Sequence, residues 1–229
     1  MSDPLPPSPQ SPSWPVLSPV EARVLGVLIE KELTTPDYYP LTLNALVAAC
    51  NQKNNRDPVM QVDDTTALAA TDTLREKKLA WQVFLAGNRV PKYRHAFLDV
   101  YRVPIDAVAL LCELLLRGAQ TAAELRSRAE RLHEYPDVSG VEDLLGRLAA
   151  HAEGPFVARL SREPGRRESR YAHLLCGPVA AAAAGPQAAP SAEPVRVTKE
   201  AARLAALEKS VAELQARLQA LETRLNQVL

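Results

Sequence analysis

Apolar residues recur at steps of three and four near the start of the chain, as they do along one face of a helix. This spacing holds at Val20, Val24, Leu25, Leu28, Ile29 and Leu33. Ser18 precedes the run as an N-cap, Pro19 suits the first helical turn, and Glu21 can complete a capping box with the serine. The pattern predicts a helix that ends before the PDYYP stretch at residues 36–40.

The following segments predict two more helices and a β-hairpin. A short second helix covers residues 41–50, and a third runs from about Asp64 to Lys78, with Asp63 or Asp64 as its cap. The apolar period then changes to two in LAWQVFL and VPKYRHAF, which the turn AGNR separates. Three helices followed by a two-stranded hairpin are the elements of a winged helix.

The next part of the chain repeats this plan. Pro104 opens a first helix, Thr121 caps a second, Ser139 caps a third, and FVARLSREPGRRESRYAHLL follows as a hairpin. Both hairpins close on a Tyr-x-His step at the same place, which indicates a tandem duplication. The sequence thus predicts a mainly α fold with small β-hairpins, built from winged-helix domains at residues 17–103 and 104–177.

The flanking segments differ in composition from these two domains. Residues 1–16 contain six prolines and are expected to be a disordered leader, and the Ala/Pro-rich residues 178–197 a flexible linker. Residues 198–229 carry a heptad seam at Leu204, Leu207, Val211, Leu214, Leu218, Leu221, Leu225 and Val228. The seam favours a homodimer through this helix, and the alternative is an amphipathic helix docked on its own globule.

Charge and cysteine content limit the possible environments of the chain. Basic and acidic residues both number 27, so a long-range basic field is absent and any nucleic-acid binding must rest on local patches. The three cysteines form no CxxC pair, which fits buried free thiols in a reducing cytosol. Without a signal-peptide pattern or a long uncharged apolar run, we expect a cytoplasmic protein with no membrane partner.

Several segments resemble a known family. LSPVEARVLGVLIEKELTTPDYYPLTLNALVAACNQKNNRDPVM, LREKKLAWQV and GNRVPKYRH are similar to the YceH-like family of bacterial proteins of unknown function. The likeness spans about residues 17 to 176. It implies a pair of winged-helix domains, often followed by a short coiled-coil tail, and it implies no particular biochemical activity.

The stretch CNQKNNRDPV between the second and third helices has two interpretations. In a helix-turn-helix this segment lies near the nucleic-acid backbone, and its polar side chains could hold phosphate oxygens. The candidates are Asn51, Gln52, Lys53, Asn55 and Arg56. Alternatively, an asparagine caps the second helix in a left-handed conformation and Asp57-Pro58 forms a turn.

The two third helices are poor recognition helices, whereas the hairpins are basic. From Asp63 to Lys78 the chain has four acidic and three basic residues, and acidic groups facing phosphate are costly. The hairpin candidates for phosphate contact are Arg89, Lys92, Arg94, Arg162, Arg166 and Arg167. We therefore predict salt-dependent binding of double-stranded DNA through its backbone, by a protein that could act as a transcriptional regulator.

Two other classes of function are alternatives to DNA binding. A protein-interaction scaffold would use exposed aromatic side chains, with Tyr38, Tyr39, Trp81 and Tyr93 as candidates. An enzyme is disfavoured, because the chain lacks GxSxG, HExxH, GxGxxG and GxxxxGK[ST] motifs. No histidine has a second ligand at metal-binding spacing, so no metal or cofactor is expected. Glu30-Lys31-Glu32 is interpreted as a solvated helix face.

Overall fold

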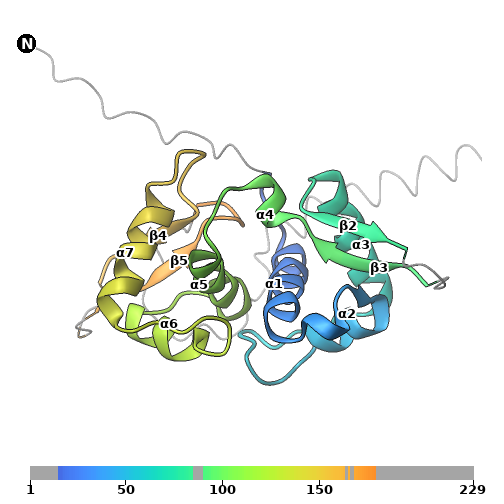
Figure 1. The fold of residues 1–229 in the computed structure, drawn as a ribbon, viewed down its shortest axis with the longest axis horizontal. Helices are drawn as coiled ribbons and strands as arrows, with labels where there is room; N and C mark the ends of the chain where they lie inside the picture. The colour runs from blue at the N-terminus through green and yellow to red at the C-terminus, as the bar shows by residue number, and fades with distance from the viewer. Residues whose placement is uncertain (1–14, 85–89, 163–164, 166–167, 179–229) are drawn as a thin grey trace, which may run out of the picture. The chain divides into compact units, whose positions relative to one another are not determined.

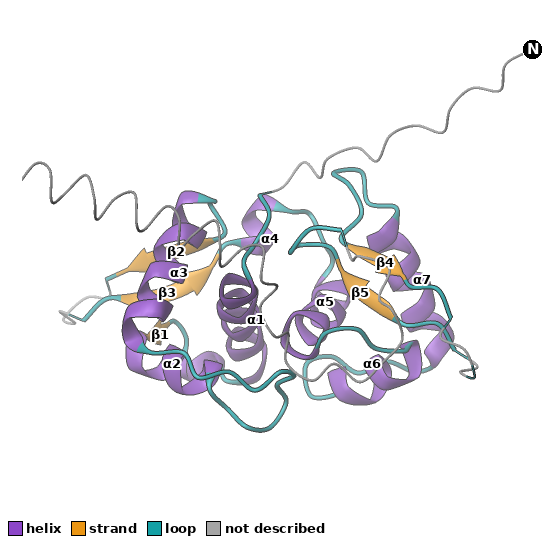
Figure 2. Cartoon of the chain, turned by 180° about the vertical axis from the view of Figure 1, so that it is seen from behind, coloured by secondary structure: helices purple, strands orange, loops and turns teal. Residues whose placement is uncertain are grey.

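The computed structural model describes residues 15–84, 90–162, 165 and 168–178. Helices and short antiparallel strands form a mixed α+β fold, as predicted (Figures 1 and 2). The predicted leader, the linker and the heptad seam at residues 204–228 lie almost wholly outside the described residues. No helix of the described ranges has the length and apolar character needed to cross a membrane.

The first half, residues 15–103, has three main helices, and a side chain caps each of them, at Ser18 and Asp63 as predicted and at Thr42 without a prediction. Ser18 accepts a hydrogen bond from the backbone N–H of Glu21 and the Glu21 carboxylate accepts one from Ser18 N–H, which completes the capping box. Thr42 and Asp63 cap the next two helices. The elements are α1 (Pro19–Thr34), η1 (Pro36–Tyr38), β1 (Leu41–Thr42), α2 (Leu43–Cys50), α3 (Asp64–Glu76), β2 (Ala80–Val83), β3 (Lys92–His95) and α4 (Phe97–Val100).

The strands of the first half form a three-stranded antiparallel sheet in the order β1-β3-β2. The hairpin β2–β3 was predicted, and the two-residue strand β1, which pairs Leu41 with Tyr93, was not. Alternate residues of a strand point to opposite sides of a sheet. Tyr93 and His95 are accordingly buried, while Lys92 and Arg94 lie on the other side and are partly exposed.

The second half, residues 104–178, repeats this order of elements. Thr121 and Glu124 form the predicted capping box of the second helix. The third helix starts earlier than predicted, because Asp137, and not Ser139, accepts the capping hydrogen bond from Gly140 N–H. The elements are α5 (Ile105–Arg117), α6 (Ala122–Ala129), α7 (Val138–Ala149), β4 (Val157–Arg159) and β5 (Tyr171–His173). An isolated antiparallel bridge joins Gln120 to Tyr171. It corresponds to the pairing of β1 with β3 in the first half.

Helices α1 and α5 pack side by side between the two halves (Figures 1 and 2). Their approach is close at Gly26, where an added Cβ would lie 3.0 Å from a Leu116 methyl carbon. The buried apolar residues of both halves form one continuous cluster around these helices. The two halves therefore share a core, and a domain boundary between residues 103 and 104 stays a prediction.

The cysteines occupy two kinds of environment. Cys50 and Cys112 are buried free thiols, as predicted. Cys176 is exposed, so its predicted burial is wrong. An apolar neighbour in the sequence does not ensure burial for a residue that follows the last strand.

Candidate nucleic-acid interface

The turn between α2 and α3 is closed by its own asparagines. The Asn51 side chain donates a hydrogen bond to Val62 O and accepts one from Val62 N–H, both at 2.7 Å. Asn55 has a φ of 60°, in the left-handed region that asparagine tolerates, and its side-chain oxygen accepts a hydrogen bond from Arg117. These contacts of the two asparagine side chains stabilise the turn.

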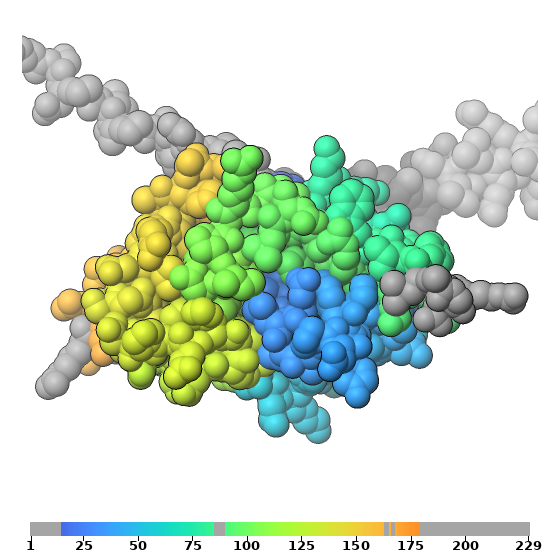
Figure 3. Space-filling view, in the orientation of Figure 1, coloured from blue at the N-terminus to red at the C-terminus, as the bar shows by residue number. Residues whose placement is uncertain are grey.

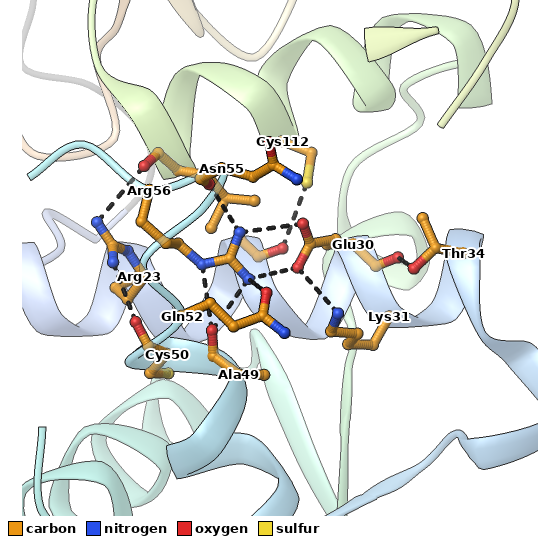
Figure 4. A network of polar contacts seen from close by, with 12 residues as sticks. Arg23, Glu30, Lys31, Thr34, Ala49, Cys50, Gln52, Asn55, Arg56 and Cys112 are labelled. Atoms are coloured by element: carbon orange, nitrogen blue, oxygen red, sulfur yellow. Dashed lines mark hydrogen bonds and ion pairs between the residues drawn. The ribbon is translucent and has the colours of Figure 1, made fainter. Parts of the chain in front are cut away.

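Arg56 points into the protein and pairs with Glu30 of α1 (Figure 4). Its Nη1 and Nη2 lie 3.0 and 2.5 Å from the two carboxylate oxygens of Glu30, and both side chains are fully buried. The guanidinium also donates to Ala49 O and to the side-chain oxygen of Gln52. The prediction that Arg56 contacts phosphate therefore needs correction, as does the placement of Glu30 on a solvated face.

The same ion network reaches the second half of the protein. Arg131, whose side chain is 30% exposed, lies 2.6 Å from a Glu30 oxygen and 2.7 Å from a Glu113 oxygen. Arg117 Nε lies 3.2 Å from the other oxygen of Glu113. Arg131 of the second half thus bridges two buried carboxylates, one on α1 and one on α5.

The pKa values of the two carboxylates shift in opposite directions. Burial alone would raise the pKa of Glu30, but the hydrogen bonds and charges of Arg56 and the charge of Arg131 outweigh it, so the pKa is lowered. Burial raises the pKa of Glu113, and Arg131 and Arg117 offset this only in part. Glu30 is therefore the better stabilised anion of the pair.

A second arginine holds the same turn from inside. Arg23 of α1 is 1% exposed and donates to Cys50 O (3.1 Å), Pro58 O (2.6 Å) and Leu116 O (3.4 Å) (Figure 4). Burial, with the nearby charge of Arg56, lowers its pKa. Sequence analysis missed this role, although a signal was present: Arg23 and Glu30 are seven residues apart and lie among the apolar positions of the first helix.

Of the candidates in this turn, Lys53 and Gln52 remain exposed. The side-chain oxygen of Gln52 accepts a hydrogen bond from Arg56, and because Arg56 is buried, Lys53 is the cation of Asn51–Arg56 that is exposed to solvent. The turn projects from the lower edge of the space-filling view (Figure 3). Its contact surface is therefore much smaller than the sequence predicted.

The first hairpin presents its cations outward. Lys92 and Arg94 lie on the side of β3 opposite the buried Tyr93 and His95. The Arg94 side chain is 40% exposed and lies 3.2 Å from Asp99, an exposed pair of the kind that contributes little to stability. Arg89 lies outside the described residues.

The second hairpin also exposes arginine. Arg159 and Arg162 are exposed, and with Glu142 and Glu168 they border a cavity of about 180 Å³. The guanidinium of Arg159 lies 6.0 Å from the ring centre of Tyr171. Arg166 and Arg167 lie outside the described residues.

Both third helices expose carboxylates in their N-terminal halves. Asp63 and Asp64 are exposed at the start of α3, where Asp63 accepts a hydrogen bond from Thr66 N–H. Glu142 and Asp143 are exposed in α7. Carboxylates in these positions suit helix capping and oppose insertion into a DNA groove.

The four aromatic candidates divide into two groups. Tyr38 is 78% and Trp81 44% exposed. Tyr93 is buried, and the Tyr39 hydroxyl accepts a hydrogen bond from His95 N–H.

Within the described ranges, no three His, Cys, Asp or Glu side chains gather as a metal site.

These features define an α+β protein whose halves share a core, are tied by a buried ion network, and carry outward cations on two hairpins. Residues 17–166 match a family described as "Protein of unknown function, DUF480", and the chain belongs to this family. A UPF0502 protein of Geotalea uraniireducens is 51% identical over 196 residues, which cover 86% of this chain and 89% of the relative. A UPF0502 protein of Aeromonas hydrophila is 48% identical over 217 residues, 93% and 98% of the two chains. The resemblance to uncharacterised bacterial proteins of the YceH-like type is thus confirmed.

Proposed function

We propose that each half is a winged helix and that the protein binds double-stranded DNA through backbone contacts of its hairpins. Transcriptional regulation is the role that such binding would serve. We further propose that the protein has no catalytic activity and that it is located in the cytoplasm. It also includes a homodimer formed through the heptad seam at residues 204–228, which lies outside the described part of the chain.

One observation carries the proposal: Lys92 and Arg94 project from the same side of β3, away from the core. Lysine and arginine at this spacing can meet successive phosphates, and contacts to phosphate position a protein without reading bases. The acidic first turn of α3 argues against deep insertion of that helix into a groove. We therefore expect weak sequence preference and strong dependence on salt.

The second hairpin offers a separate contact. Strands β2–β3 and β4–β5 lie on opposite sides of the α1–α5 pair (Figure 2). Arg159 and Arg162 would therefore meet a different stretch of nucleic acid from Lys92 and Arg94. Because α1 and α5 belong to one core, the two hairpins would bind as parts of one body.

The test is fluorescence anisotropy of a labelled random-sequence duplex at several salt concentrations. The double variant Lys92→Ala/Arg94→Ala is expected to weaken binding and to reduce the slope of log K against log salt by about 2, since each lost phosphate contact removes roughly 0.9. The control, Arg102→Ala/Arg147→Ala, removes two exposed arginines elsewhere and should bind as the wild type does. Unchanged binding by the Lys92/Arg94 variant would refute this interface.

A protein-interaction module is the second candidate function, and one observation favours it. Trp81 and Phe84 of the first hairpin are 44% and 65% exposed, although both are large apolar side chains. Exposed aromatic residues often anchor protein partners. A scaffold without nucleic-acid binding would show no salt-dependent anisotropy with the duplex.

A further inference from the structure

Strand β2 lies at the edge of its sheet, and the hydrogen bonding of the hairpin shows which of its backbone groups face outward. Leu79 O accepts a hydrogen bond from Ala96 N–H at 2.8 Å, so these residues form a hydrogen-bonded pair. Such pairs alternate with non-hydrogen-bonded pairs along an antiparallel ladder. The register therefore makes Gln82–Tyr93 a non-hydrogen-bonded pair.

The other side of β3 agrees with this assignment. Tyr93 pairs with Leu41 of β1, and His95 N–H donates to the Tyr39 hydroxyl at 2.6 Å. Both residues thus direct their backbone groups away from β2. It follows that the N–H and C=O of Gln82 point to the outer edge of β2, where the described residues supply no further strand.

A groove of about 550 Å³ runs between this edge and α3. Trp81 and Gln82 line it from β2, and Asp72, Arg75 and Glu76 line it from α3. Arg75 lies 2.8 Å from Asp72, so these two charges offset each other and exposed Glu76 carries the remaining charge. The groove therefore joins a free strand edge, a half-exposed indole and a net negative charge.

We propose that this groove binds an extended peptide segment of a partner protein, which adds to β2 as a further strand and carries a lysine or arginine. The backbone of Gln82 supplies one donor and one acceptor for strand addition. Glu76 attracts the basic side chain, and the indole face of Trp81 favours a cation beside it. The proposal specifies the site of the second candidate function and does not depend on DNA binding.

Three capped peptides, added to the full-length ¹⁵N-labelled protein, test the proposal by amide chemical shifts. They are acetyl-Thr-Val-Lys-Val-Thr-amide, the same peptide with glutamate for lysine, and a version with alternate backbone amides N-methylated. The lysine peptide is expected to shift resonances of residues 72–83 and to bind about tenfold more tightly than the glutamate peptide. N-methylation should abolish binding, because it removes the strand-pairing donors.

Variants separate the backbone contribution from the charge contribution. Gln82→Pro removes an outward N–H that the ladder does not use, a substitution that edge strands tolerate, and should abolish binding, while Gln82→Thr should bind normally. Glu76→Gln should weaken the lysine peptide several-fold. Arg159→Ala/Arg162→Ala, on the second hairpin, should leave peptide binding unchanged, which distinguishes this site from the DNA interface.

Three results would overturn the proposal. The first is equal affinity for the lysine, glutamate and N-methylated peptides. The second is a set of shifts confined to residues outside 72–83, and the third is the absence of saturable binding. The N-methylated peptide keeps the test decisive even if Gln82→Pro does not fold.

Discussion

Arg56 and Glu30 form a two-pronged ion pair between the α2–α3 turn and α1, with contacts of 3.0 and 2.5 Å and both side chains fully buried. The pair fixes the position of the turn, and Arg131 extends it to the second half. A charge buried in this way must keep its partner, because an unpaired buried ion is strongly destabilising. The polar character of the turn is therefore largely structural.

Removal of the Glu30 charge is expected to be costly. Glu30→Gln leaves the guanidinium of Arg56 buried without its anion and should lower the free energy of unfolding by roughly 3–5 kcal/mol. Glu113→Gln is the matched control, and it should cost less because burial already raises the pKa of Glu113. Urea denaturation of the two variants measures the difference. Equal losses would contradict the unequal roles of the two carboxylates.

The stabilisation from Glu30 should also depend on pH. Its folded-state pKa lies below the ordinary 4.5, so its contribution is present above pH 4.5 and is lost as the pH falls through the folded-state value. The difference in unfolding free energy between the wild type and Glu30→Gln should therefore shrink below pH 4.5. Denaturation curves at several pH values measure this, and a difference that grows in acid would be the opposite result.

Local patterns were sufficient to predict the main helices and the hairpins, but not the two-residue strand β1 or the buried ion network. The capping boxes at Ser18 and Thr121 involve residues three apart, and the hairpins follow from a period of two, so both are visible in short windows. Arg56 and Glu30 are 26 residues apart, and nothing near either residue shows that they meet. A run of polar residues in a turn reads the same in the sequence whether the side chains face solvent or the core. The sequence therefore does not show which of them are available for contacts. Lys92 and Arg94, which the sequence offered only as basic residues of a hairpin, lie on the side of β3 opposite the buried Tyr93 and His95.

The close approach of α1 and α5 leads to a prediction about two helical glycines. Gly146 of α7 is exposed and an added Cβ meets nothing within 4 Å, so Gly146→Ala should stabilise the protein by about 0.5–1 kcal/mol through helix propensity. Gly26→Ala gains the same propensity but places its Cβ 3.0–3.2 Å from Leu115 and Leu116 side-chain atoms. Overpacking of a core costs typically about 1–3 kcal/mol, so this variant should be the less stable of the two. Thermal unfolding compares them, and equal stabilisation would show that α1 and α5 separate readily at Gly26.

The lowered pKa of His173 leads to a second prediction about how stability depends on pH, in a different pH range. Burial lowers its pKa from 6.5 to about 4, so the folded protein holds it neutral where the unfolded chain binds a proton. Stability from this residue is complete above pH 6.5 and falls by about 1.4 kcal/mol per pH unit as the pH drops from 6.5 toward 4. His173→Gln should flatten the stability profile in that window, as measured by urea denaturation at several pH values. A profile of His173→Gln that matches the wild type would contradict the buried neutral state.

The heptad seam leads to a prediction about association. A chain that ends after Gly185 lacks Leu204 through Val228 and should halve the number of copies per particle, from two to one, in light scattering. The full-length variant Leu207→Asp/Leu214→Asp is the matched control, because charges at two seam positions should dissociate the dimer without removal of the helix. If the seam instead packed on its own globule, both proteins would keep the wild-type particle number. The buried network of Glu30, Arg56 and Arg131 does not include residues 198–229, so the unfolding midpoint of the shared core should change much less than it does in Glu30→Gln.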